Sequence, residues 1–116
     1  KKKTSKILEI QGDGSETRAF IHIDDFVNGF DIAIKKAKHL DIINIGSDNE
    51  IKILELVKII KKLMNSNCDI KSGKLREGST LRRCPDISKL KEFGFKINVD
   101  LEQSLPQIIQ WYSNNH

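Results

Sequence analysis

The residue best placed for chemistry in this sequence is Arg18, which closely follows a turn containing Gly12 and Gly14. Glycine adopts positive φ angles at little steric cost, so this segment can reverse the chain direction. Apolar and β-branched residues on both sides, at 6–10 and 18–23, predict a β-hairpin or two strands joined by a loop of about four to six residues. Asp24 is then expected to end the second strand and cap a helix beginning at Asp25. The guanidinium of Arg18 would lie at a strand–helix corner, where it can hold an anionic ligand.

Other reactive residues form no recognisable catalytic or metal site. Cys68 and Cys84 lie far apart without a paired-cysteine motif, which predicts two free thiols. Residues 12–17 lack the third glycine of a dinucleotide-binding turn, and they lead into a predicted strand instead of a helix. A calcium-binding loop starting at Asp13 would place Arg18 where that loop requires glycine. The sequence therefore predicts neither a bound metal nor a bound dinucleotide.

Apolar periodicity predicts four helices. Apolar side chains recur at helical spacing in three long segments, and a shorter helix is bounded by Pro85 and Gly94. The last helix is expected to begin with a capping box at Asp100 and to bend at Pro106. A buried strand is expected at residues 42–46 and a weaker strand at 68–71. The predicted helices are residues 25–38, 50–64, 86–93 and 101 onward, which together with short strands indicate an α/β fold.

The composition is typical of a soluble globular domain. The chain has 116 residues, of which 38% are hydrophobic and 31% charged. Its apolar runs are shorter than the roughly 18 residues that cross a membrane, so we expect a cytoplasmic protein without membrane contact. The net charge of +4 favours an anionic partner. Nucleic acid is not the partner we expect, because no aromatic residues alternate with the basic ones.

Three segments of the chain resemble one protein family. Gly-Asp-Gly-Ser-x-Thr-Arg-x-Phe-x-x-x-Asp-Asp, at residues 12–25, is similar to a signature of the extended short-chain dehydrogenase/reductases, specifically the NAD-dependent nucleotide-sugar epimerases and dehydratases. The second segment spans residues 76–89, and the third spans 93–112. These three segments occur in the same order and at the same spacing as the corresponding motifs in the last third of a family member. The resemblance implies that residues 1–116 are a single fragment, the C-terminal nucleotide-sugar-binding region of a Rossmann-type enzyme.

The resemblance also implies roles for four residues of this sequence. Arg18 and Arg76 would hold the two phosphates of a nucleotide sugar from opposite sides. Ile53 would pack near the nucleotide base. The alternative, that Ile53 is a residue of the hydrophobic core, remains open. Ser79 stands where relatives carry an aspartate that accepts hydrogen bonds from ribose hydroxyls. The resemblance leaves open whether Ser79 makes the same contact with the ribose.

The same resemblance implies that the intact enzyme uses NAD, bound by an upstream glycine-rich turn, with an upstream Tyr-x-x-x-Lys pair for catalysis. The single tyrosine of this sequence, Tyr112, has His116 four residues later instead of lysine. We therefore expect this chain to bind no NAD and to be inactive alone. The expected ligand is a nucleotide sugar of the UDP- or dTDP-hexose type. Epimerase, dehydratase and decarboxylase reactions remain open, as do the particular nucleotide and sugar.

Strands that belong to a larger sheet would leave unpaired edges in this chain, so self-association or exchange of elements between copies is expected.

Two other functions remain open. The chain could be a non-catalytic basic module that binds an acidic partner or nucleic acid, or an inert product of truncation. Binding that weakens steeply with salt would indicate the basic module.

Overall fold

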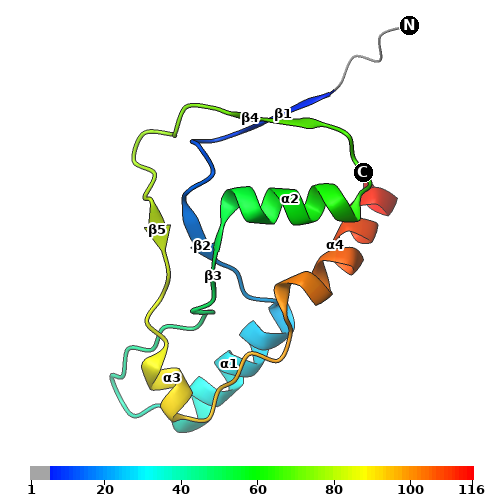
Figure 1. Ribbon diagram of the computed structural model, residues 1–116. Helices are drawn as coiled ribbons and strands as arrows, with labels where there is room; N and C mark the ends of the chain where they lie inside the picture. The colour runs from blue at the N-terminus through cyan, green and yellow to red at the C-terminus, as the bar shows by residue number, and fades with distance from the viewer. Residues whose placement is uncertain (1–5) are drawn as a thin grey trace, which may run out of the picture. The chain divides into compact units, whose positions relative to one another are not determined.

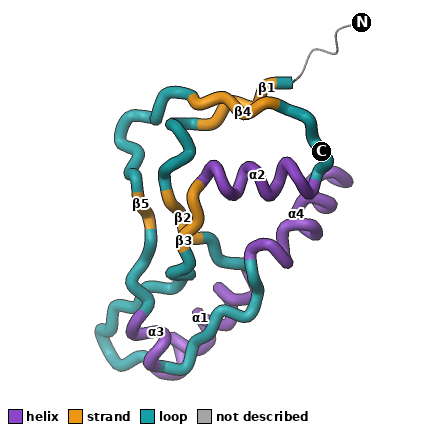
Figure 2. The backbone as a smooth tube through the Cα atoms, in the orientation of Figure 1, coloured by secondary structure: helices purple, strands orange, loops and turns teal. Residues whose placement is uncertain are grey.

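The computed structural model describes residues 6–116, which form an α/β fold of five short strands and four helices (Figure 1). The predicted fold class is confirmed. Figure 2 shows that loops alone connect β1 to β2 and β4 to β5. In chain order the elements are β1 (Ile7–Ile10), β2 (Thr17–Ala19), α1 (Ile23–Lys36), β3 (Glu50–Lys52), α2 (Ile53–Leu63), β4 (Asp69–Ser72), β5 (Arg82–Arg83), α3 (Ser88–Glu92) and α4 (Leu101–Asn115).

The described residues divide into two compact units. The first contains residues 6–18 and Ile51–Arg83, and the second contains Ala19–Glu50 and Cys84–His116. The chain passes from one unit to the other three times, so neither unit is continuous in sequence.

Parallel pairing organises the strands of the first unit. β1 pairs with β4 in parallel, from Ile7 opposite Asp69 to Ile10 opposite Ser72. β2 pairs with β5 in parallel, and β3 lies on the other side of β2. The predicted hairpin is therefore wrong, because β1 and β2 belong to different sheets. The alternative, two strands joined by a loop, is confirmed.

The loop at residues 11–16 fails to form a hairpin because it is attached to α2. Gly12 and Gly14 have φ angles of 69° and 84°, as expected for glycines in a turn. The carbonyl of Gly14 accepts a hydrogen bond from the Leu54 N–H at 3.0 Å, and a Cβ at Gly14 would lie 2.6 Å from the Leu54 Cβ. This contact directs the chain across the first turn of the helix instead of back along β1.

The core of the second unit is built around α3. Ile87, Leu90 and Phe95 are buried together, and side chains from α1 and from the segment after it pack against them. Gly29 lies on the buried side of α1, where a Cβ would stand 3.3 Å from both Leu90 and Phe95. The missing side chain permits this close approach and explains a glycine inside a helix.

The start of α1 differs from the prediction. The helix begins at Ile23, and the Nδ1 atom of its N-cap residue His22 accepts a hydrogen bond from the Asp24 N–H at 3.1 Å. Asp25, expected as the first helical residue, is only 2% exposed. Its carboxylate accepts hydrogen bonds from the backbone N–H groups of Asn98 and Val99. Burial of this carboxylate fixes the first turn to the segment before α4.

Two further sequence predictions are wrong. Residues 42–46 form no strand, and Ile42 is 83% exposed while Ile43 and Ile45 pack against the core. The Asn44 side chain donates to the carbonyl of Asp86, so this segment is fixed partly through a side chain. Asp100 precedes α4 but makes no capping hydrogen bond through its side chain, so the capping box is absent.

The other element boundaries are close to the predictions. Residues 50–52 form β3, so α2 begins three residues later than expected. The weak strand at 68–71 is confirmed as β4, while β5 had no sequence signal. Pro106 lies inside α4, and the bend expected there stays a prediction.

Candidate functional site

A pocket in the first unit brings together three of the four residues singled out in the sequence. It has a volume of about 240 Å³ and contains Arg18, Ile53 and Ser79. The fourth residue, Arg76, is exposed and does not line it. We call this cavity the Arg18 pocket; its lining residues are Gln11, Glu16, Arg18, Ile53, Leu75 and Ser79.

Backbone hydrogen bonds position the pocket residues. The N–H of Ile53, the first residue of α2, donates to the carbonyl of Glu16 at 2.9 Å. Arg18 lies on β2, opposite Arg83 of β5. The Ser79 N–H donates to the carbonyl of Arg76 at 3.0 Å, closing a turn that places Arg76 beside the pocket although its side chain does not line it. Three distant segments of the chain are thus fixed around one cavity.

Arg18 is partly buried, and its contacts leave donors available. Its Nη1 atom donates to the carbonyl of Thr17 at 2.7 Å, and its Nη2 atom lies 3.5 Å from the Ser79 hydroxyl, a long hydrogen bond. A guanidinium has five N–H donors in a planar arrangement that matches phosphate and carboxylate oxygens. Among residues 6–116, Arg18 forms no ion pair with a carboxylate. The side chain can therefore bind an anionic group in the pocket.

Glu16 is a pocket residue that the sequence analysis did not identify. It is only 3% exposed, and its Oε2 atom has no hydrogen-bond partner among the described residues. Its carboxylate occupies the space where a Cβ of Gly12 would lie. Only the position of Glu16 within the Gly12–Asp25 motif could have drawn attention to it, because its burial depends on a loop far away in sequence.

The loop beside the pocket contains an ordered carboxylate. Asp13 accepts hydrogen bonds through Oδ1 from the Ser15 hydroxyl at 2.6 Å and from the Ser15 N–H at 2.9 Å. These bonds favour the charged form and hold the pKa of Asp13 below its usual value of 3.8. Asp13 is exposed, so we assign these bonds a role in ordering the turn.

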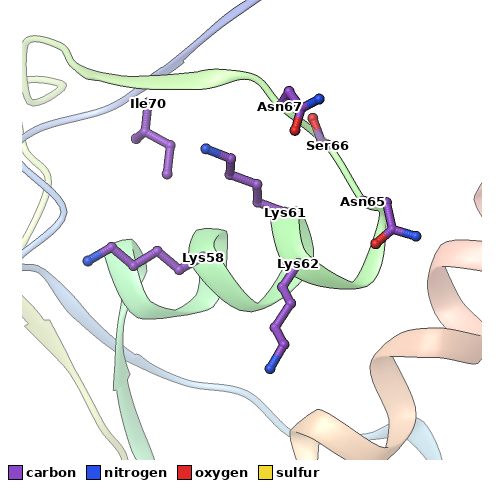
Figure 3. A pocket seen from close by; sticks show the side chains of 7 residues that line it. All are labelled: Lys58, Lys61, Lys62, Asn65, Ser66, Asn67 and Ile70. Atoms are coloured by element: carbon purple, nitrogen blue, oxygen red, sulfur yellow. The ribbon is translucent and has the colours of Figure 1, made fainter.

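A second concavity in the first unit is lined by lysines. It has a volume of about 480 Å³ and lies between the C-terminal end of α2 and β4. Figure 3 shows Lys61 extending toward the segment that carries Ile70, whereas Lys62 extends from the opposite side of the helix. The residues lining it are Lys58, Lys61, Lys62, Asn65, Ser66, Asn67 and Ile70.

The lysine-lined concavity has a structural explanation. Lys61 and Lys62 lie in the last turn of α2, where the negative end of the helix dipole stabilises positive charge. Asn65, with a φ of 49°, then turns the chain away from the helix. Because the lysines diverge, this surface is a weaker candidate for a specific site than the Arg18 pocket.

Within the part of the chain that the structure describes, no three His, Cys, Asp or Glu side chains gather closely enough to hold a metal ion. Cys68 and Cys84 are free thiols. None of the helices in residues 6–116 combines the length and the apolar character needed to cross a membrane.

Comparison with known proteins shows similarity to one family. A sequence model described as the NAD dependent epimerase/dehydratase family matches residues 1–46. UDP-glucuronic acid decarboxylase 2 of Arabidopsis thaliana is 33% identical over 104 residues, which are 89% of this chain and 23% of that protein. A putative UDP-glucose 4-epimerase of Methanocaldococcus jannaschii is 32% identical over 107 residues, which are 92% of this chain and 34% of that protein.

The fold agrees with this relationship. A crystal structure of UDP-glucuronic acid 4-epimerase from Bacillus cereus, in complex with UDP-glucuronic acid and NAD, is 27% identical. The two structures superpose with a TM-score of 0.85 over 96% of this chain and 36% of the other. The chain is therefore similar, over nearly its whole length, to part of the proteins of the NAD-dependent epimerase/dehydratase family. The resemblance drawn from the three sequence segments is thereby confirmed.

Only part of a typical epimerase/dehydratase is represented in this chain. It spans 23% and 34% of the length of the two curated relatives and 36% of the B. cereus enzyme. Both curated relatives are named for reactions of UDP-sugars.

Neither the Gly12–Gly14 turn nor Tyr112 has the surroundings expected of an NAD site. The Gly12–Gly14 turn leads from β1 into strand β2, so no helix N-terminus follows it to receive a pyrophosphate. Tyr112 lies on α4 in the second unit, stacked on the ring of His116. No reaction step through NAD can therefore be derived from this chain, and its own candidate chemistry is binding at the Arg18 pocket.

Proposed function

We propose that residues 1–116 form the nucleotide-sugar-binding region of an NAD-dependent epimerase/dehydratase and do not catalyse its reaction alone. The observation that carries this proposal is the Arg18 pocket. Arg18, Ile53 and Ser79 come from distant parts of the sequence, yet all three line one cavity. The names of the relatives favour a UDP-sugar as the ligand.

Each lining residue has a role that its chemistry supports. Arg18 binds a phosphate of the nucleotide through paired N–H donors. Ile53 and Leu75 supply the apolar part of the pocket, against which the base or ribose packs. Ser79 offers a hydroxyl beside the guanidinium. Arg76, exposed in the neighbouring turn, contacts the second phosphate.

The chemistry of the intact enzyme lies outside these residues. NAD supplies hydride transfer when it is bound, and the residues described here hold and orient the nucleotide sugar. The choice between epimerase, dehydratase and decarboxylase reactions depends on groups that this chain does not provide.

Isothermal titration calorimetry with UDP, using the 116-residue chain at moderate salt, tests the proposal. Arg18→Ala removes a charged hydrogen bond worth about 1.5–3 kcal/mol, so affinity should fall about 10- to 150-fold. Lys62→Ala is the matched control, since it removes one positive charge from the other concavity. UDP affinity should be unchanged in that variant.

Two results would contradict the proposal. If UDP does not bind to the folded chain, this region alone is not the binding site. If Arg18→Ala and Lys62→Ala weaken UDP equally, the binding is diffuse electrostatic attraction and not recognition at the Arg18 pocket.

The lysine-lined concavity favours one other candidate function, a basic module that binds an acidic partner. No acidic residue lines that concavity in the described part of the chain. Binding of this kind would weaken steeply with salt and accept many polyanions. UDP titrations at two salt concentrations, compared with heparin, distinguish the two functions.

A further inference from the structure

Glu16 places a buried carboxylate at the Arg18 pocket. It is 3% exposed and lines the cavity, and its Oε2 atom has no partner among the described residues. A polar group removed from water without a compensating hydrogen bond destabilises the folded protein. A ligand that donates to this carboxylate would remove that penalty.

The neighbouring cation does not serve this purpose. Arg18 directs its donors to the Thr17 carbonyl and the Ser79 hydroxyl, and within residues 6–116 it forms no ion pair with Glu16. The pocket thus contains an acceptor, the Glu16 carboxylate, and a cation, the Arg18 guanidinium, that do not bond to each other. A ligand satisfying both must carry hydrogen-bond donors as well as an anion.

The position of the carboxylate is built into the loop. Gly12 has a φ of 69°, and a Cβ at this position would overlap the Glu16 carboxylate and approach Leu75 to 3.1 Å. The glycine therefore leaves the space that Glu16 occupies. Packing of this kind limits the rotamers available to the carboxylate and fixes it beside the cavity.

The shared cavity indicates which part of a nucleotide reaches Glu16. Glu16, in the loop just before β2, lines the same cavity as Arg18. If Arg18 holds the phosphates, the ribose, which is joined directly to them, is the group that we place beside Glu16. Its 2′- and 3′-hydroxyls are donors, and carboxylates bind ribose hydroxyls in other nucleotide sites.

We propose that Glu16 accepts hydrogen bonds from the ribose hydroxyls of the bound nucleotide, so that the pocket selects ribonucleotides over deoxyribonucleotides. The inference rests on the proposed function and narrows it. UDP- or GDP-sugars become the expected ligand class, and dTDP-sugars, which lack the 2′-hydroxyl, are disfavoured.

Calorimetric titration of the 116-residue chain with UDP and with 2′-deoxyuridine 5′-diphosphate tests the inference, because the two ligands differ by one hydroxyl. The wild-type chain should bind UDP at least about tenfold more tightly, the effect of one charge-assisted hydrogen bond. In Glu16→Leu, which keeps a similar volume without an acceptor, the ratio of the two affinities should fall to about one. Glu16→Gln, which keeps one acceptor, should give an intermediate ratio.

The outcomes separate this inference from the proposed function. Equal binding of the two nucleotides to the wild-type chain overturns the inference and leaves the nucleotide site intact. A ratio that persists in Glu16→Leu overturns it as well, because a purely structural role would weaken both ligands equally. Failure of the wild-type chain to bind UDP overturns the proposed function and the inference with it.

Discussion

Replacement of Asp25 by alanine should strongly destabilise the second unit. The Asp25 carboxylate accepts from the Asn98 N–H at 3.1 Å and from the Val99 N–H at 2.9 Å. Hydrogen bonds to a charged group contribute about 1.5–3 kcal/mol each. Two bonds at the lower end of that range give an expected loss of about 3 kcal/mol, and the freed N–H groups would need new partners.

Urea unfolding followed by circular dichroism and by fluorescence measures this loss. Trp111, the single tryptophan, lies on α4 in the same unit as Asp25 and reports on that unit. Asp24→Ala is the matched control, because it removes the same charge from the same helical turn at a side chain that is 79% exposed. That variant should lose about 0.3–1 kcal/mol through the helix dipole.

The reasoning fails if Asp25→Ala and Asp24→Ala have equal free energies of unfolding. That result would show that the buried bonds contribute no more than the charge of the first turn. Asp25→Asn keeps an acceptor of similar shape and should fall between the two alanine variants.

Two further predictions follow from the glycines and from the exposed face of α1. Gly14→Ala and Gly78→Ala both place alanine at a positive φ, but of these two positions only Gly14 has other atoms within reach of the new Cβ. Thermal or urea unfolding should therefore show Gly14→Ala to be less stable than Gly78→Ala by about 1–3 kcal/mol. Equal losses of stability would contradict the packing described for the loop. We also expect the chain to self-associate through the apolar side chains exposed on α1. Light scattering should show smaller particles for the double variant Val27→Lys, Phe30→Lys than for the wild-type chain. A monomeric wild-type chain would refute this expectation. The exposed apolar residues of this face are Ile23, Val27, Phe30 and Ile34.

The helices could be predicted from the sequence because their apolar faces repeat locally. Their ends were less predictable, since they depend on particular side chains. His22 caps α1 through its ring nitrogen, and Asp25 is held by residues near α4, so the start of this helix differs from the position indicated by Asp24. A carboxylate early in a helix looks the same in sequence whether it is exposed or buried.

The strands were predicted less well because most are too short to show alternation. β5 consists of Arg82 and Arg83, which have no apolar pattern, and it is defined by pairing with β2. Residues 42–46 have the composition of a buried strand, yet only part of this segment packs inward. Short apolar runs fit an extended loop over a core as well as they fit a strand.

The grouping of Arg18, Ile53 and Ser79 could be predicted only through the family resemblance, because nothing in their local sequence connects them. The resemblance includes Glu16 in its first motif but assigns it no role. Its burial requires the space at Gly12 and the side chain of Leu75, which lies far along the chain.

The discontinuous first unit has a consequence for folding during synthesis. β1 and Arg18 leave the ribosome before β4, Ser79 and β5, which follow only after the whole second helix. Until then β1 lacks β4, its parallel partner among the described residues, and contacts so distant in sequence form slowly because a long loop must close first. The Arg18 pocket therefore cannot be complete before Ser79 emerges, and the first unit closes only when β5 follows.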